Sequence, residues 1–263
     1  MKVIRKILPL KKLERNKCKI TIVMPAYNAE KTLYKTYNLI PKGSYDDIIL
    51  VDDESNDNTV AVAKSIDGLK VLCHEKNLGY GGNQKTCYKE ALENGSDIIV
   101  MLHPDYQYDP TIIPNITLPI LEGQADVVFA SRMLGDPILG GPCQGGMPIY
   151  KYFANKILTF IENKVLKTYF TEFHTGYRAF SGDSLNAINF ANNSNSFVFD
   201  NEIIIQLLMK GAIFKEIPVV TKYHIDASSV DFKEGVIYGF NVLRTIVKYL
   251  LHVKLIKQYK MFS

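Results

Sequence analysis

Short runs of apolar residues alternate along the chain with segments whose apolar positions recur at helical spacing. The runs are continuous rather than alternating, which predicts strands that are buried on both faces of a sheet. We expect strands at residues 19–25, 46–53, 69–74, 97–102, 125–130 and 213–219. We expect helices at residues 28–40, 57–66, 84–94, 111–121, 150–165, 200–210 and 235–258. Strand–helix alternation indicates an α/β fold with a Rossmann-like, mostly parallel central sheet flanked by helices.

Polar residues follow most of the predicted strands at the point where each strand ends. The segments are "PAYN", "DDESND", "HPDYQ" and "SR". Ligands of such sheets bind beyond the carboxyl ends of the strands, so we expect the functional site at this edge.

The pattern changes after Arg132. Residues 134–148 are rich in Gly and Pro, which predicts a flexible loop that is able to act as a lid. Residues 172–183 predict a loop that leads into a further strand and a helix start, and residues 222–235 predict another polar loop. No internal repeat or linker interrupts the chain, so we expect one domain over residues 1–263.

The composition of the chain is that of an ordinary globular protein. Of 263 residues, 47% are hydrophobic, and the net charge of +4 is too small to indicate a nucleic-acid partner. The four cysteines show no CxxC spacing, so we expect reduced thiols in a cytoplasmic protein. Lysines and a proline interrupt the N-terminal apolar run, and no apolar window is long enough for a membrane span.

Three carboxylates crowd the end of the second predicted strand, at Asp52, Asp53 and Asp57. Carboxylates so close together repel one another unless hydrogen-bond donors or cations meet them. They could accept from a nucleoside base and its ribose hydroxyls. Alternatively, Asp57 caps the next helix and Asp53 is a turn residue.

The glycines of "NLGYGGNQ", residues 77–84, do not form a dinucleotide fingerprint. Gln84 stands where the third glycine would be needed, and the segment follows the third predicted strand rather than the first. The glycines either let the backbone approach a ligand, let a helix start tightly against the sheet, or form a plain loop.

The segment "HPDYQYDP" places His103, Asp105 and Gln107 at alternate positions. In an extended segment these side chains would face one point. A divalent cation that also binds nucleotide phosphates needs only one or two protein carboxylates. An imidazole ligand would favour manganese over magnesium. Alternatively, Asp105 alone contacts the metal and His103 packs at the sheet end.

In this order, the segments "PAYNAE", "VDDESNDNT", "NLGYGGNQ", "HPDYQ" and "SR" resemble the family 2 glycosyltransferases with the GT-A fold, over roughly residues 19 to 230. The segments "TGYRAF" and "FVFDNEIIIQLLMKGAIFKEIPV" are similar to the dolichol-phosphate mannose synthase-like, polyprenol-phosphate branch of that family. The resemblance implies a nucleotide-sugar-binding half at 1–132, an acceptor-side half at 133–234 and a basic amphipathic C-terminal helix at 235–263.

The resemblance also implies roles for particular residues. The nucleotide would contact Pro25, Tyr27, Glu30, Asp53, Gly79 and Gly82. Asp105 and Gln107, with His103, would bind Mn²⁺ or Mg²⁺. Arg132 and Arg178 would hold a phosphate of the donor or of an acceptor lipid, and Glu202 would lie near the acceptor. These four, Asp105, Arg132, Arg178 and Glu202, are the expected catalytic residues.

The implied reaction is a metal-dependent, inverting transfer of a sugar from a UDP- or GDP-sugar. The acceptor would be a polyprenyl phosphate, which needs no general base, or a glycan hydroxyl, for which Glu202 or Asp200 could act as base, in cell-envelope glycan synthesis. His103 replaces the first Asp of the family's usual metal motif, Glu172 replaces another Asp, and "YHIDASS" replaces an Arg-containing loop. A catalytically silent nucleotide-sugar-binding protein is therefore the alternative. A sugar-1-phosphate nucleotidyltransferase ranks last, because "PAYNAEKTL" lacks its Gly-rich loop.

The last predicted helix repeats apolar residues at spacings of three and four, with basic residues between them. The apolar positions are Val236, Phe240, Leu243, Val247 and Leu250. Such a helix could lie on the inner face of an anionic membrane. It could equally cover the core or contact a second copy of the chain.

Overall fold

The computed structural model describes residues 9–134, 142–223 and 232–262. Seven strands form one sheet in the order β3-β2-β1-β4-β6-β5-β7. The strands are β1 Ile20–Ala26, β2 Asp47–Asp52, β3 Leu69–Cys73, β4 Ile98–Met101, β5 Val127–Ser131, β6 Arg178–Ser181 and β7 Phe214–Pro218. Only β6 runs antiparallel to its neighbours, β4 and β5. The predicted mostly parallel α/β sheet is confirmed.

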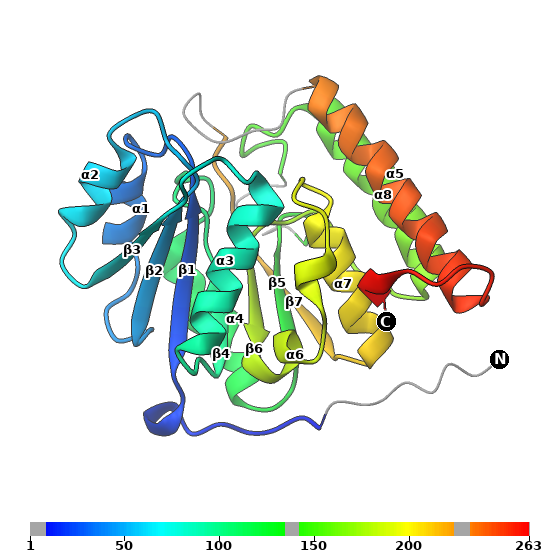
Figure 1. Ribbon diagram of the computed structural model, residues 1–263, viewed down its shortest axis with the longest axis horizontal. Coiled ribbons are helices and arrows are strands. Elements are labelled where there is room, and N and C mark those ends of the chain that lie inside the picture. The colour runs from blue at the N-terminus through cyan, green and yellow to red at the C-terminus, as the bar shows by residue number, and fades with distance from the viewer. Residues whose placement is uncertain (1–8, 135–141, 224–231, 263) are drawn as a thin grey trace.

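Helices cover both faces of this sheet (Figure 1). They are α1 Leu33–Asn38, α2 Thr59–Lys64, α3 Tyr80–Glu93, α4 Ile113–Leu121, α5 Ile149–Leu166, α6 Gly182–Asn186, α7 Phe199–Lys210 and α8 Phe232–Val253, with short 3₁₀ turns at Arg15–Lys17, Pro110–Ile112, Phe190–Asn192 and Lys260–Phe262. Alternate strand residues point to opposite faces. Ile22 and Met24 therefore pack with α1, α2 and α4, and Val23 packs with α3 and α7.

Helix α3 begins at Tyr80, four residues before the predicted start. The residue before it, Gly79, has φ 81°, a conformation that favours glycine. A Cβ on Gly81 would lie 2.5 Å from the Ser194 carbonyl oxygen and 2.7 Å from Phe199 Cβ. These glycines therefore let the first turn of α3 pack against the segment before α7.

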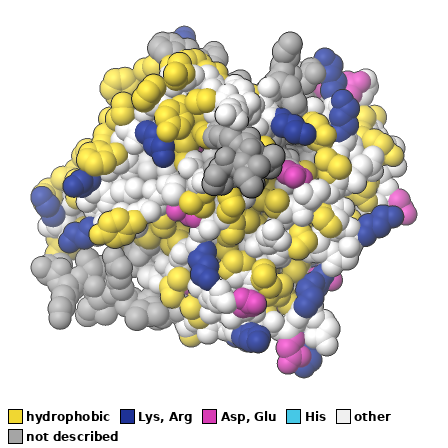
Figure 2. Space-filling view, turned by 180° about the vertical axis from the view of Figure 1, so that it is seen from behind, with side chains coloured by type: hydrophobic (Ala, Val, Ile, Leu, Met, Phe, Trp, Pro, Cys, Tyr) yellow, Lys and Arg dark blue, Asp and Glu magenta, His cyan; other side chains and the backbone are white. Residues whose placement is uncertain are grey.

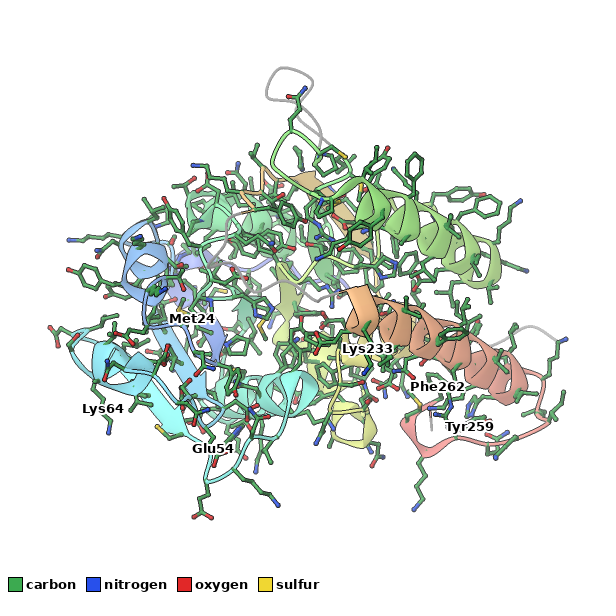
Figure 3. The ribbon with its side chains drawn as sticks, turned by 90° about the horizontal axis from the view of Figure 1, so that it is seen from above. Met24, Glu54, Lys64, Lys233, Tyr259 and Phe262 are labelled. Carbon is green, nitrogen blue, oxygen red and sulfur yellow. The ribbon has the colours of Figure 1, made fainter. Side chains whose placement is uncertain are left out.

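Helices α5 and α8 lie side by side beyond the edge of the sheet, as Figures 1 and 3 both show. The chain after α8 folds back, so that the Phe262 ring lies 5.5 Å from His252, and both Phe262 and Tyr259 appear beside α8 in Figure 3. Among the described residues, no helix is both long enough and apolar enough to cross a bilayer.

The predicted acceptor-side half supplies β6 and β7 to the sheet that also contains β1 to β5. The predicted division of the chain at residue 132, into a nucleotide-sugar-binding half and an acceptor-side half, stays a prediction. Residues 135–141 of the predicted Gly- and Pro-rich loop and residues 224–231 of the predicted polar loop lie outside the described residues, and the predicted lid stays a prediction.

Candidate active site

The chain turns sharply after β4 instead of continuing as an extended segment. Tyr106 has φ 57°, and the backbone N–H of Gln107 donates to Asp105 Oδ1 over 3.0 Å. The expected extended backbone was therefore wrong. The turn still brings His103, Asp105 and Gln107 to the wall of one cavity of about 520 Å³. The three side chains therefore lie together, as the sequence predicted, but a turn rather than an extended segment brings them together.

His103 lies against Tyr80 of α3, with the two rings stacked at a centroid distance of 5.4 Å. Its Nε2 is 3.3 Å from Tyr80 Oη, which donates its single proton to Asp200 Oδ2 over 2.8 Å. His103 Nε2 must therefore donate to Tyr80, which leaves a lone pair on Nδ1. Burial lowers the pKa of His103, so the imidazole is neutral and able to act as a ligand through Nδ1.

The donor set fits a cation that is shared with phosphates rather than one enclosed by protein. Within the described ranges, no group of three or more His, Cys, Asp or Glu side chains converges as a metal cage. Asp105 and Gln107 supply one carboxylate and one amide oxygen at the cavity wall. Mg²⁺ and Mn²⁺ in nucleotide sites take their remaining ligands from phosphate and water.

Asp200, at the start of α7, also faces the cavity. Its carboxylate accepts from Tyr80, from Gln84 Nε2 over 3.1 Å, and from Arg178 over 3.0 Å. Arg178 is 1% exposed, donates to the Phe173 carbonyl oxygen over 3.0 Å, and does not line the cavity. The structure therefore makes Arg178 the buried counter-ion of Asp200, and its predicted contact with a phosphate stays a prediction without geometric support.

Arg132, at the end of β5, does line the cavity. Its Nε and Nη2 pair with Glu172, Nη2 to Oε2 over 2.7 Å, and Nη2 also donates to the His174 carbonyl oxygen over 2.8 Å. Nη1 donates to Tyr223 Oη over 2.9 Å. Although burial opposes it, the guanidinium holds the pKa of Glu172 below its usual range. Four of the five N–H groups of Arg132 thus have partners among the described residues, and the side chain is held at the cavity wall.

Tyr223 adds a second donor beside Arg132 that sequence reasoning missed. Burial raises the pKa of Tyr223 to about 12, so its hydroxyl keeps its proton at neutral pH. That hydroxyl accepts from Arg132 and lies on a residue that lines the cavity. The only sequence signal was its place in the segment that departs from the family pattern.

Glu202 does not line the cavity. Its carboxylate accepts from the backbone N–H of Ser194 over 2.6 Å and is 2% exposed. Burial raises the pKa of Glu202. Asp200, rather than Glu202, is the α7 carboxylate at the cavity, so the predicted place of Glu202 near the acceptor gains no support from the geometry.

The loops after β1 and β2 are tied to each other by the residues that were predicted to bind the nucleotide. Glu30 accepts from the backbone N–H of Asn58 over 3.0 Å and from its Nδ2 over 3.1 Å. Pro25 is buried at the end of β1, whereas the Tyr27 ring is 52% exposed. Of these side chains, Tyr27 is the one with a large surface open to a ligand, and the nucleotide contacts stay predictions.

Asp53 organises the loop before α3. Its carboxylate accepts from the backbone N–H groups of Leu78 over 2.8 Å and Gly79 over 2.9 Å, and lies 2.6 Å from His74 Nδ1. Gly79 and Gly82, which were predicted beside the nucleotide, approach Asn195 and Leu78 so closely that a Cβ would lie within 2.9 Å and 2.6 Å of them. In the structure these two glycines allow α3 to begin in close contact with its neighbours, which was one of the alternatives that the sequence left open.

The outer half of the cavity is apolar and runs between α5 and α8. Its wall includes Tyr150, Ala154 and Leu158 of α5, with Val236, Phe240 and Leu243 of α8. The cavity thus joins a polar end, at the carboxyl edge of the sheet, to an apolar end that opens between two exposed helices. Such a shape suits a ligand with a charged head and a hydrocarbon chain.

The mostly parallel seven-stranded sheet and its flanking helices form a GT-A fold. Solved structures of glucosyl-3-phosphoglycerate synthase from Mycobacterium tuberculosis share this fold. One complex, with Mg²⁺ and UDP, has a TM-score of 0.68 at 18% identity and covers 89% of this chain and 80% of that one. A complex with Mn²⁺, UDP and phosphoglyceric acid has a TM-score of 0.67 at 15% identity and covers 91% and 83%.

The chain belongs to glycosyl transferase family 2, whose sequence model matches residues 21–188. A UDP-N-acetylglucosamine–dolichyl-phosphate N-acetylglucosaminyltransferase of Methanococcus voltae is 30% identical over 78% of this chain and 86% of its own length. An uncharacterized protein of Methanocaldococcus jannaschii is 32% identical over 89% and 93%. The predicted family is confirmed, and this protein is a family 2 glycosyltransferase.

Proposed function

We propose that the protein transfers a sugar from a nucleotide-sugar donor, with Mn²⁺ or Mg²⁺, to the phosphate of a polyprenyl phosphate, with inversion at the anomeric carbon. The observation that carries this proposal is the single cavity that has Asp105, Gln107 and Arg132 at one end and α5 with α8 at the other. The Methanococcus voltae relative, whose name gives UDP-N-acetylglucosamine and dolichyl phosphate as substrates, supports a UDP-sugar donor and this acceptor class.

The donor diphosphate would lie at the turn after β4. Asp105 and Gln107, with His103 Nδ1 beside them, would hold the divalent cation there. Bound at this place, the cation would offset the charge that develops on the leaving nucleoside diphosphate. The stacked ring of Tyr80 and the backbone of Gly176, whose Cβ would lie 3.0 Å from the His103 ring, fix the imidazole.

The acceptor phosphate would bind the remaining N–H of Arg132 and the hydroxyl of Tyr223. A phosphate oxygen then attacks the anomeric carbon opposite the leaving diphosphate, so that one C–O bond forms as the other breaks. No proton needs to be removed, because the phosphate is already an anion. Asp200, the α7 carboxylate at the cavity, already accepts from Tyr80, Gln84 and Arg178, which leaves it poorly placed to deprotonate a sugar hydroxyl.

The exposed faces of α5 and α8 would bring the cavity to the membrane that contains the acceptor. Both helices expose large apolar side chains, and Figure 2 shows these interleaved with lysines over α5. The exposed residues are Ile149, Phe153, Ile157 and Phe160 of α5, with Val236, Ile237, Phe240 and Val247 of α8. Apolar side chains with a basic rim suit the interface of an anionic bilayer. The protein would thus be a peripheral membrane enzyme of cell-envelope glycan synthesis.

Product analysis tests the reaction. Purified protein is incubated with UDP- and GDP-sugars, Mn²⁺ and a polyprenyl phosphate, and the lipid is examined by mass spectrometry. We expect one hexose or N-acetylhexosamine on the lipid phosphate with the wild type and none with Asp105→Ala. Transfer to a glycan hydroxyl alone would overturn the acceptor assignment. Donor binding without transfer to either acceptor would favour the silent binding protein.

Vesicle sedimentation tests the membrane contact. We expect the wild type to sediment with vesicles that contain phosphatidylglycerol, and the Phe153→Asp/Phe240→Asp variant to stay in solution. Tyr34→Asp is the matched control, because Tyr34 is 56% exposed on α1, at the other end of the sheet. Equal sedimentation of all three proteins would contradict the assignment of α5 and α8 as the membrane face.

A further inference from the structure

Four polar side chains, two of them buried and two partly buried, form a ring between α5, α7, α8 and the segment before β6. His174 Nδ1 lies 2.7 Å from Tyr238 Oη, which lies 2.6 Å from Asn201 Oδ1. Asn201 Nδ2 lies 2.6 Å from Glu162 Oε1. The ring closes where Glu162 Oε2 lies 3.2 Å from His174 Nε2. These contacts join three helices at a point where water has little access, since Glu162 and Asn201 are 0% and 1% exposed.

The directions of these hydrogen bonds follow from the single proton of the Tyr238 hydroxyl. Tyr238 donates it to Asn201, so His174 Nδ1 donates to Tyr238. His174 Nε2 faces Glu162 Oε2 across 3.2 Å, and neither atom has a hydrogen-bond partner among the described residues.

The ring also reaches the reaction site through His174. The carbonyl oxygen of His174 accepts from Arg132 Nη2 over 2.8 Å, while its imidazole binds Tyr238 of α8. We propose that His174 is a positioning residue that couples the placement of α8 to the placement of the Arg132 guanidinium. A displacement of α8 would pull on the imidazole and, through it, on the carbonyl that orients Arg132. This inference rests on the proposed function only where its test measures kinetics with the lipid acceptor.

Other charges around the ring set its electrostatic environment. Burial, followed by the charges of Glu162 and Asp200, raises the pKa of Tyr238 well above its usual value, and Arg178 and Arg132 oppose this. Tyr238 therefore keeps its proton throughout the working pH range, and the hydrogen-bond directions above hold there.

Kinetics of ring variants test the coupling. Asn201→Leu opens the ring without touching the cavity wall, so it is the deciding variant; Tyr238→Phe removes the link from α8 at a residue that itself lines the cavity. Because small misplacements of a binding group are costly, we expect kcat/KM for polyprenyl phosphate to fall by about 10-fold to 100-fold, through KM of the lipid, with KM of the nucleotide sugar unchanged. Tyr34→Phe, the same change at a residue of α1 that is 56% exposed and outside the ring, should behave as the wild type. Equal losses for donor and lipid would show a purely structural role and overturn the proposal.

Hydrogen exchange separates failure of this inference from failure of the proposed function. The backbone N–H of Arg132 donates to Glu172 Oε1, so its exchange reports whether the arginine stays in place. In Asn201→Leu we expect faster exchange both in α8 and at the Arg132 amide, even if no lipid acceptor is ever found. Faster exchange in α8 with an unchanged Arg132 amide would refute the coupling.

Discussion

Arg178 provides the sharpest test of how the structure assigns its buried charges. The Arg178→Met variant removes the cation that lies 3.0 Å from Asp200, together with a donor to the Phe173 carbonyl and a guanidinium 5.4 Å from the centre of the Phe129 ring. Breaking a buried ion pair by removing one partner costs about 3–5 kcal/mol, because the other charge is left uncompensated. We therefore expect the free energy of unfolding, measured by urea titration, to fall by that amount.

A double-mutant cycle shows whether the loss comes from the pair. Asp200→Asn removes the stranded charge, so Arg178→Met/Asp200→Asn should be about 2 kcal/mol more stable than the sum of the single changes predicts. Arg15→Met is the surface control. The Arg15–Asp46 pair is 39% and 42% exposed, and its loss should cost no more than about 1 kcal/mol. A loss below about 1 kcal/mol for Arg178→Met, together with weaker donor binding, would refute the counter-ion role and favour a phosphate contact.

Four further predictions follow from single residues. Asp105→Asn, or chelation of the metal with EDTA, should lower product formation by about 100-fold or more, and added Mn²⁺ should restore only the chelated wild type. Because Arg132 lowers the pKa of Glu172, the stability from their pair is present above the ordinary glutamate pKa of about 4.3 and is lost as pH falls through the lowered value. Glu172→Gln should therefore flatten the pH dependence of urea unfolding below about pH 4.3 and lower stability at pH 7. Gly81→Ala should cost about 1–3 kcal/mol in thermal unfolding, since the new Cβ would lie 2.5 Å from the Ser194 carbonyl. Gly235→Ala, with open space around it in helix α8, should stabilise by about 0.5–1 kcal/mol.

The sequence predicted the strands well because their signal is local. Continuous apolar runs are visible without knowledge of their neighbours, and the five strands β1 to β5 lie where the runs do. The antiparallel insertion of β6 between β4 and β5 depends on long-range pairing that no local pattern contains. The early start of α3 depends likewise on contact with Ser194 and Asn195, far along the chain.

The candidate site shows the same division between local and distant information. His103, Asp105 and Gln107 could be found because one short segment carries all three. Which charged side chains reach the cavity could not be predicted, since residue type does not tell a buried counter-ion such as Arg178 from a ligand. The partners of Arg132, among them Tyr223, come from distant segments and carry no motif of their own.

A crystal structure of the protein with Mn²⁺, UDP and a short-chain polyprenyl phosphate tests the central claim most directly. We predict that Asp105 and Gln107 bind the cation together with the UDP phosphates. The lipid phosphate should lie beside Arg132 and Tyr223, with its chain between α5 and α8. A cation without contact to Asp105, or a lipid chain that lies outside the space between these helices, would contradict the account.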